Sequence, residues 1–292
     1  MLAQYKLTIS IFLCTLVFFL SCKEQKPSQG IRKKVSEIIF DDPIQDSLKD
    51  FWYTHQVASP DRLKIVNDPD NSNNDLLKVS LQVGDKVAGG SRSEIIIKPK
   101  DSFGYRNNYS FRFKFPKSFF ENEEKEGVIL LNQWHNVPYP GYNYTNQIVK
   151  VRVPFAMMVK HTTDGEFYML LHYGLKVGIL NEMVFAKWPG NLKPDVWYTF
   201  ENEIFWSLYD DGYAIPKIDG TCFQVEDKDV CTFKGANMYH VRPHDYKMGL
   251  YWSAGHMHDR YIYYDDFKME SGRSSYFPTT LIDTITTVKN NE

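Results

Sequence analysis

Apolar and polar residues alternate with a period of two along several short segments of the chain. Residues 77–83 read Leu-Lys-Val-Ser-Leu-Gln-Val, residues 111–115 read Phe-Arg-Phe-Lys-Phe, and residues 149–155 read Val-Lys-Val-Arg-Val-Pro-Phe. Successive side chains of a strand point to opposite faces, so this pattern predicts strands with one buried face and one wet face.

Further strands are expected where β-branched and aromatic residues gather between Gly, Pro, Asn and Asp residues, namely at 93–98, 128–135, 167–173, 197–206, 246–253 and 261–269. A long period of 3.6 residues, which would indicate helices, does not occur. The sequence therefore predicts an all-β fold, a jelly-roll sandwich of two antiparallel sheets of the concanavalin-like kind. In such a fold one concave sheet often carries the ligand site.

The N-terminus has the pattern of an export signal. Lys6 precedes an apolar run from Leu7 to Leu20, and Ser21-Cys22 is followed by polar residues. The segment Phe19 to Cys22 resembles a bacterial lipobox, which implies a lipoprotein signal peptide over 1–21, a lipid anchor at Cys22 and a flexible tether over 22–36. The resulting location is the outer membrane, on its periplasmic or cell-surface face. The alternative is a plain cleaved signal that happens to contain a cysteine.

Export would place the remaining cysteines in an oxidising compartment. Cys222 and Cys231 are separated by a short polar segment and could close a local hairpin as a disulfide. A metal site at these two residues is disfavoured, because no further Cys or His stands at ligand spacing.

Length and charge limit the remaining possibilities. The mature chain fits one catalytic domain, which we place at 37–272 and follow with a C-terminal tail at 273–292. A net charge of -2 on 292 residues excludes the strong overall attraction expected of a general nucleic-acid binder. A polyanionic partner would therefore have to be bound by a local basic site. Separately, we expect the protein to be a monomer.

Aromatic residues are abundant, with 19 Tyr, 20 Phe and 6 Trp. Most would fill a sandwich core, but Trp134, Tyr139, Tyr142 and Tyr144 cluster where a strand passes into a loop rich in Pro and Gly. Sugar rings stack on such side chains. Trp134, Tyr142 and Tyr144 are therefore predicted to bind a carbohydrate.

Three short segments carry residues able to perform chemistry: Ser91-Arg92-Ser93-Glu94, Asn132-Gln133-Trp134-His135 and Tyr246-Lys247-Met248-Gly249-Leu250-Tyr251. Residues two apart on a strand share a face. Gln133 would therefore project with His135, Arg92 with Glu94, and Lys247 with Tyr251, with Gly249 leaving room for a ligand above its face. Asn132 would point to the opposite face.

This set of residues suits β-elimination at a uronate. Removal of the C5 proton puts charge on the adjacent carboxylate, which Arg92 and Gln133 could neutralise. His135 and Tyr251 are residue types that can take the proton and protonate the leaving O4 near neutral pH. Glu94 is expected to orient the Arg92 guanidinium beside the bound substrate.

The same three segments resemble the motifs shared by jelly-roll polysaccharide lyases, a group that includes the heparin lyase of the first type, glucuronan lyases and, more distantly, alginate lyases with a Gln-x-His motif. The motifs stand in the same order, and the resemblance spans about Asp75 to Met269. It implies that the chain is a carbon–oxygen lyase acting on an acidic polysaccharide, with His135 and Tyr251 as the catalytic pair and Gln133 and Arg92 at the carboxylate. The products would carry 4,5-unsaturated uronate ends.

Two departures from the heparin-specific pattern put sulfated substrates in doubt. Trp252 follows Tyr251 where a basic residue would be expected, and the chain is shorter. Basic side chains that could line subsites, besides Lys247, are Lys150, Arg152, Lys160, His161, His172, Lys176 and Arg260. No cofactor is required by this chemistry, although related lyases can hold calcium away from the reaction.

Two other functions remain open. A glycoside hydrolase on the same fold needs two carboxylates facing one bond, and Glu201-Asn202-Glu203 is the nearest candidate but lacks the third acid of the usual motif. A non-catalytic glycan-binding lipoprotein would need the aromatic loop but no His and Tyr pair. The Asp265-Asp266 pair could suggest a metal site, but we interpret it as part of the last strand and its turn.

Overall fold

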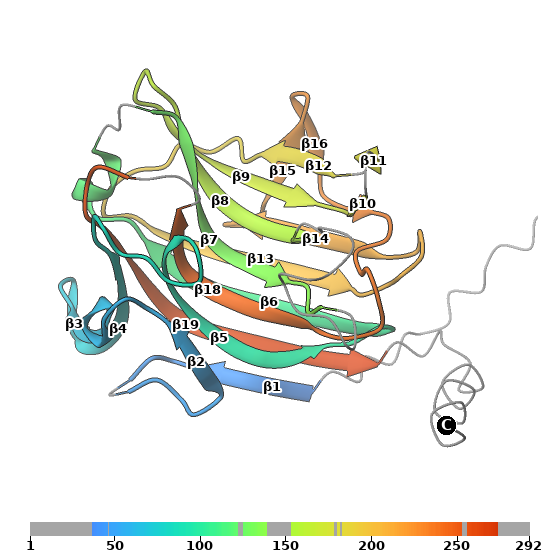
Figure 1. Cartoon of the computed structure of the whole chain (residues 1–292), viewed down its shortest axis with the longest axis horizontal. Coiled ribbons are helices and arrows are strands. Elements are labelled where there is room, and N and C mark those ends of the chain that lie inside the picture. The colour runs from blue at the N-terminus through green and yellow to red at the C-terminus, as the bar shows by residue number, and fades with distance from the viewer. Residues whose placement is uncertain are drawn as a thin grey trace, which may run out of the picture. The chain divides into compact units, whose positions relative to one another are not determined.

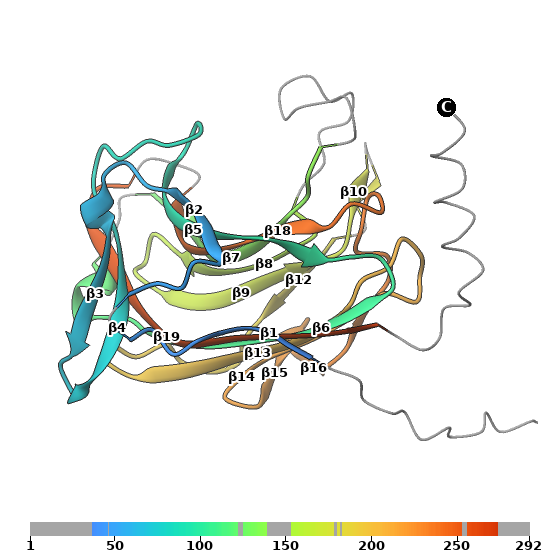
Figure 2. The ribbon, with the colours of Figure 1, turned by 90° about the horizontal axis from the view of Figure 1, so that it is seen from below.

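The computed structural model describes residues 37–45, 47–121, 125–138, 153–177, 180–181, 183–252 and 256–273. Most of these residues form antiparallel strands in two layers that face each other (Figures 1 and 2). This arrangement confirms the predicted all-β sandwich. None of the described segments is a helix long and apolar enough to cross a bilayer.

One layer, called sheet B here, contains in spatial order β2 (Trp52–Gln56), β5 (Ser91–Asp101), β18 (His244–Trp252), β7 (Gly127–His135), β8 (Phe155–His161), β9 (Phe167–Tyr173) and β12 (Val184–Lys187), and β12 pairs in turn with the short strand β15 (Thr221–Val225). The late strand β18 lies between two much earlier strands, β5 and β7. This order brings the three motif-bearing segments side by side.

The other layer, sheet A, has the order β3 (Leu63–Asp68), β4 (Asn71–Leu81), β19 (Arg260–Arg273), β6 (Tyr105–Lys114), β13 (Trp197–Phe205) and β14 (Tyr213–Ile218). The first strand, β1 (Glu37–Asp42), pairs with the second half of β19. The short elements are β10 (Lys176–Val177), β11 (Leu180–Asn181), β15 (Thr221–Val225), β16 (Lys228–Val230), β17 (Phe233–Lys234) and the 3-10 turns η1 (Pro60–Arg62) and η2 (Lys117–Phe120).

Most of the predicted strands overlap observed strands, with shifts at their ends. Residues 167–173 form β9 as predicted, and the strand predicted at 149–155 begins only at Phe155, while 149–152 lie outside the described residues. The strands β1, β2, β3, β12 and β14 were not expected. They are short or carry a weak alternation of apolar and polar residues.

The inner faces of the two sheets enclose an aromatic core. Trp134 from β7 has no exposed surface and lies with its ring centroid 5.0 Å from that of Tyr109 in sheet A and 4.7 Å from that of Phe155. Buried aromatic pairs in such tilted or edge-on arrangements add to the stability provided by the buried apolar area. The core fixes which residues of sheet B face away from sheet A.

Two irregularities in pairing, one in β7 and one in β18, lie next to each other in sheet B. The pairing of β7 with β8 shifts between Leu130 and Asn132, and the pairing of β18 with β7 shifts between Met248 and Tyr251. The hydroxyl of Tyr264, from β19 of sheet A, lies 3.0 Å from the carbonyl oxygen of Leu131 and 2.9 Å from that of Gly249. It therefore provides a donor for carbonyl groups at both shifts.

Gly249 has a role different from the one predicted. Its φ is 150°, and a Cβ at this position would overlap the carbonyl oxygen of Ser93 in the neighbouring strand β5. Glycine is needed here because two backbones approach closely, a reason that the sequence analysis did not give.

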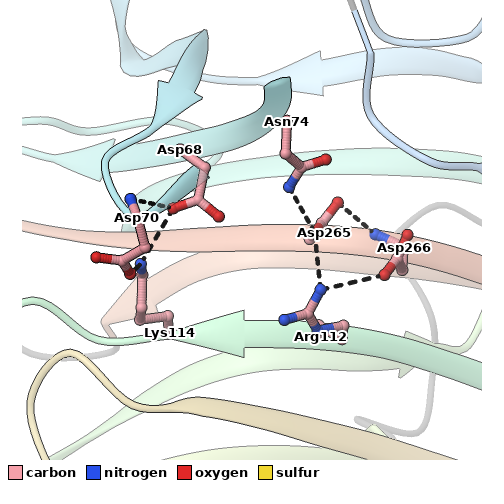
Figure 3. A network of polar contacts seen from close by, with 7 residues as sticks. All are labelled: Asp68, Asp70, Asn74, Arg112, Lys114, Asp265 and Asp266. Atoms are coloured by element: carbon pink, nitrogen blue, oxygen red, sulfur yellow. Dashed lines mark hydrogen bonds and ion pairs between the residues drawn. The ribbon is translucent and has the colours of Figure 1, made fainter. Parts of the chain in front are cut away.

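Charged residues on the outer face of sheet A are paired with one another (Figure 3). Asp265 is buried and accepts hydrogen bonds from Asn74 at 3.1 Å and from Arg112 at 3.2 Å, and Lys114 donates to Asp70 at 2.6 Å. Asp265 and Asp266 lie within β19, as predicted. These contacts join β4, β6 and β19.

A disulfide links Cys222 and Cys231, whose Cα atoms are 4.9 Å apart. It spans the hairpin of β15 and β16, where Glu226 and Asp227 both have positive φ, as a tight two-residue hairpin turn requires. The structure therefore contains the bridge that the spacing of the two cysteines left possible.

Candidate active site

The strand register gathers the polar motif residues on the face of sheet B that points away from sheet A. Lys247 of β18 stands opposite Gln133 of β7, Tyr251 stands opposite Arg92 of β5, and His135 stands opposite Asp245. Directly opposed residues of an antiparallel pair project from the same face. The intervening residues Trp134, Met248 and Leu250 point into the core.

Glu94 holds two of these residues in place. Its Oε1 accepts a hydrogen bond from Nε2 of Gln133 at 2.5 Å, and its Oε2 pairs with Nη1 of Arg92 at 3.3 Å. Glu94 is only 1% exposed. Because both of its oxygens are occupied by protein donors, it orients the amide and the guanidinium.

A residue that the sequence did not point to, Gln56, completes this network. Its Oε1 accepts a hydrogen bond from Nη1 of Arg92 and another from Nζ of Lys247, each at 3.2 Å. Gln56 ends the edge strand β2 and stands opposite Glu94. Strand β2 has no clear alternation, so nothing in the sequence placed Gln56 near the three motifs.

Tyr251 lies between the charged network and a small apolar patch. The Cζ atom of Arg92 is 4.0 Å from the centre of the Tyr251 ring, and a Cβ at Gly90 would overlap that ring. On its other side Tyr251 packs against a cluster containing Leu130 and Met158. The ring is therefore held in one position, with a cation stacked on it.

His135 is neutral at physiological pH. Burial lowers its pKa to about 4, and the nearby positive charge of Lys247 acts in the same direction. Its Nδ1 lies 2.9 Å from the carbonyl oxygen of Asn136, which can only accept, so Nδ1 carries the proton and Nε2 carries the lone pair. In this form His135 can accept a proton or a hydrogen bond, but it does not supply a positive charge.

Lys247 is also affected by its surroundings. Burial lowers its pKa, an effect that the negative charge of Glu94 opposes and the positive charge of Arg92 reinforces. Burial raises the pKa of the neighbouring Asp245. The formal charges of Arg92, Lys247 and Glu94 alone add to a single positive charge, which suits one bound carboxylate, while Asp245 lies beside Lys247 at the end of the network toward His135.

His135 and Tyr251 are not direct neighbours. Asp245, the partner of His135, precedes Tyr251 by six positions on β18, and Arg92 lies near both residues, since its charge acts on His135 and its guanidinium stacks on the Tyr251 ring. Arg92, Gln133 and Lys247 occupy the space between them. The residues expected to bind a carboxylate thus lie between the two residues predicted as the catalytic pair.

His172 lies in line with the network, two strands away from Gln133. Ala156 of β8 stands opposite both Gln133 and His172, and His172 in turn stands opposite Phe185 of β12. The Phe185 ring is 51% exposed and contacts the His172 ring at a centroid distance of 5.9 Å. Phe185 is an exposed aromatic side chain on the site face that the sequence analysis missed.

The prediction that Trp134 contacts the substrate is wrong, and two of the basic side chains that could have lined subsites, Arg260 and His161, are buried as well. Trp134 is fully buried in the core, because Gln133 and His135 on either side of it point to the site face. Arg260 is buried too and donates to the backbone carbonyls of Phe119 and Glu121, and His161 has no exposed surface. None of these three side chains can reach a substrate.

Several other predicted residues are outside the part of the chain that the structure describes. These are Cys22, Tyr139, Tyr142, Tyr144, Lys150 and Arg152. Within the described part, no group of three or more His, Cys, Asp or Glu side chains is arranged to hold a metal ion.

Fold and site together define a β-sandwich protein with a charged cluster on an outer sheet face. The architecture alone leaves the function open. A family model described as polysaccharide lyase matches residues 46–268. The chain belongs to this family and is an enzyme that cleaves polysaccharides, as the motifs predicted.

A solved structure of another polysaccharide lyase supports the fold. An endo-β-1,4-glucuronan lyase from the fungus Trichoderma reesei superposes with a TM-score of 0.57 at 13% identity, covering 80% of this chain and 95% of that one. The alginate lyase Aly36B gives a TM-score of 0.48 at 15% identity, covering 75% of this chain and 86% of that one. No curated protein matches the sequence significantly.

Proposed function

We propose that this lyase acts on a uronate-containing polysaccharide and cleaves it by β-elimination. The observation that carries the proposal is the network of Arg92, Lys247 and Gln133, held by Glu94 and Gln56 beside Tyr251. It presents hydrogen-bond donors and a net positive charge to a carboxylate, the group whose charge grows when the C5 proton leaves. The glucuronan lyase with the same fold acts on a polymer of this class.

In the proposed reaction Arg92, Lys247 and Gln133 bind the carboxylate of the sugar that contributes C5. A base removes the C5 proton, the electron pair forms the C4–C5 double bond, and the bond from C4 to O4 breaks. The leaving O4 then takes up a proton. Donors that are already oriented toward the carboxylate stabilise the enolate-like intermediate without reorganising.

Tyr251 is the residue we assign to the proton transfers. In D-glucuronate and D-mannuronate the C5 hydrogen and O4 lie on the same side of the ring, so one residue can take the proton and return it to O4. Stacked against the ring, the Arg92 guanidinium stabilises negative charge that develops on the phenol.

His135 has a different part in this scheme. As a neutral imidazole with its lone pair on Nε2, it can accept a hydrogen bond from a sugar hydroxyl or act as a separate base. A separate base is needed for L-iduronate or L-guluronate, in which the C5 hydrogen and O4 lie on opposite sides. His135 therefore matters most with substrates of that stereochemistry.

The direct test is product analysis. The purified domain is incubated with glucuronan, alginate, heparin, heparan and chondroitin, and the ultraviolet absorbance of 4,5-unsaturated uronate is followed. We expect absorbance to rise with an unsulfated polymer, because the network offers one net positive charge per site. If every substrate gave products with saturated ends, the enzyme would be a hydrolase and the proposed elimination would be wrong.

A further inference from the structure

Gln56 occupies an unusual position, because it joins the two cations of the candidate site. Its single carbonyl oxygen accepts from Arg92 and from Lys247 at 3.2 Å each. Both partners are pure donors, so the oxygen and not the amide nitrogen must face them. A carbonyl oxygen has two lone pairs and can accept both bonds while adding no charge.

A neutral bridge has a specific electrostatic effect. Two cations repel each other when brought together, and an acceptor shared between them offsets part of that repulsion. A carboxylate in the same place would do so more strongly, but it would cancel the single positive charge left over from Arg92, Lys247 and Glu94. The amide keeps the pair together and leaves that charge for a ligand.

We propose that Gln56 is a positioning residue that holds Arg92 and Lys247 together as one receptor for the uronate carboxylate, with the net charge of the receptor kept at one positive unit. The proposal rests on the function proposed above and adds to it a residue from outside the three motifs. It also gives the edge strand β2 a part in binding. Gln56 itself touches no reacting atom in this scheme.

The charged groups around Lys247 determine how a substitution at Gln56 should change the pKa of Lys247. Lys247 is influenced by Arg92 and Glu94 from β5 and by Asp245 from its own strand, and it acts in turn on the neutral His135 of the adjacent strand β7. Burial already lowers its pKa. A negative charge at position 56 would raise that pKa, and loss of the acceptor would lower it further, because the ammonium would lose a hydrogen-bond partner.

Two variants and one control separate charge from shape. Gln56→Glu keeps the size and the acceptor but adds a negative charge, whereas Gln56→Leu keeps a similar size and removes the acceptor. Gln82→Glu adds the same charge at an exposed side chain just after β4 and serves as the control. All three are made in the Tyr251→Phe background, so that a bound oligosaccharide is not consumed.

Two measurements are made on each protein. Calorimetry gives the dissociation constant for a β-1,4-linked glucuronate tetrasaccharide, and nuclear magnetic resonance of ¹³C-labelled lysine gives the titration of Lys247. Gln56→Glu should weaken binding about tenfold, the effect of one added unit charge in a partly buried site, and should raise the Lys247 pKa. Gln56→Leu should also weaken binding but should lower that pKa, and Gln82→Glu should change neither.

If Gln56 had only a structural role, the two Gln56 variants would not shift the Lys247 pKa in opposite directions. Binding by Gln56→Glu within twofold of the parent, or a Lys247 pKa that moves the same way in both variants, would overturn the inference. So would failure of the parent to bind the tetrasaccharide. Neither measurement depends on turnover, so a wild-type enzyme that releases no unsaturated product would refute the proposed reaction without deciding the role of Gln56.

Discussion

Tyr251 is the residue on which the proposed reaction depends most. Tyr251→Phe keeps the ring that stacks under Arg92 and packs against Leu130, but removes the hydroxyl. We expect kcat to fall by at least about a hundredfold, the usual contribution of a general acid or base, with little loss of stability. Steady-state kinetics on the best polymer, together with the melting temperature, check this expectation.

His135→Ala provides the comparison for that variant. It should abolish turnover of a guluronate or iduronate polymer and leave residual turnover of a glucuronate or mannuronate polymer. Near-normal activity of folded Tyr251→Phe would rule out the assignment of the proton transfers to Tyr251.

The lowered pKa values of the buried His244 and His135 predict how the free energy of unfolding changes with pH. Burial lowers the pKa of His244 to about 3 and that of His135 to about 4, whereas unfolded histidine titrates near 6.5. Below about pH 6.5 the unfolded chain therefore binds protons that the folded chain does not, so the free energy of unfolding falls as the pH drops toward 4. Each histidine contributes up to about 1.4 kcal/mol per pH unit to this fall.

Urea unfolding between pH 7 and 4 measures this slope. His244→Phe keeps a ring against Trp206, whose centroid lies 4.5 Å away, and removes the titrating group. In the variant the free energy of unfolding should change less with pH, because unfolding would take up about one proton fewer. If the free energy of unfolding changed with pH equally in both proteins, the pKa of His244 would not be lowered by folding.

Among the elements, the paired irregularities of β7 and β18 determine where the site residues stand. Because these strands shift register next to each other, Leu130 and Gln133 both project from the site face although they are three residues apart. Tyr264 of β19 contacts carbonyl groups at both shifts. A core residue of the opposite sheet therefore supports the active-site strands.

Tyr264→Phe tests this support. Loss of the buried hydroxyl should cost about 1–2 kcal/mol in the free energy of unfolding and should also lower kcat, since Gly249 lies two residues from both Lys247 and Tyr251. Tyr198→Phe is the control, because its hydroxyl bonds to the backbone of Lys193 and Asn191 away from the site. The control should lose stability but keep its kcat. Equal kcat values in the two variants would argue against a link between Tyr264 and the chemistry.

The sequence predicted the elements and site residues that follow simple alternation. Gln133 and His135 share a face because they are two residues apart, and the same rule excludes Trp134, which had been considered for its aromatic ring alone. Alternation does not reveal a register shift, so the reason for Gly249 was missed. Gln56 was missed because its strand is a short edge strand whose residues show no clear apolar face.

At the scale of the whole molecule, the N-terminal pattern makes an independent prediction. We propose that Cys22 carries a lipid anchor, as the apolar run from Leu7 to Leu20 and the Ser21-Cys22 junction indicate. In cells the wild-type protein should sediment with the membrane fraction, and Cys22→Ser should shift it to the soluble or unprocessed fractions. Fractionation followed by mass spectrometry of the N-terminus checks this prediction, and equal membrane association of both proteins would contradict it.

The place of β18 in sheet B has a consequence for the timing of activity. This strand comes late in the chain, at residues 244–252, yet it fills the gap between β5 and β7, which are complete by residue 135. Until the ribosome has released nearly the whole polypeptide, Arg92 and Gln133 belong to strands with no common neighbour, and neither Lys247 nor Tyr251 exists. The proposed site therefore cannot form on the nascent chain during most of its synthesis. Pairing of strands so far apart in the sequence is also expected to be a slow step in folding.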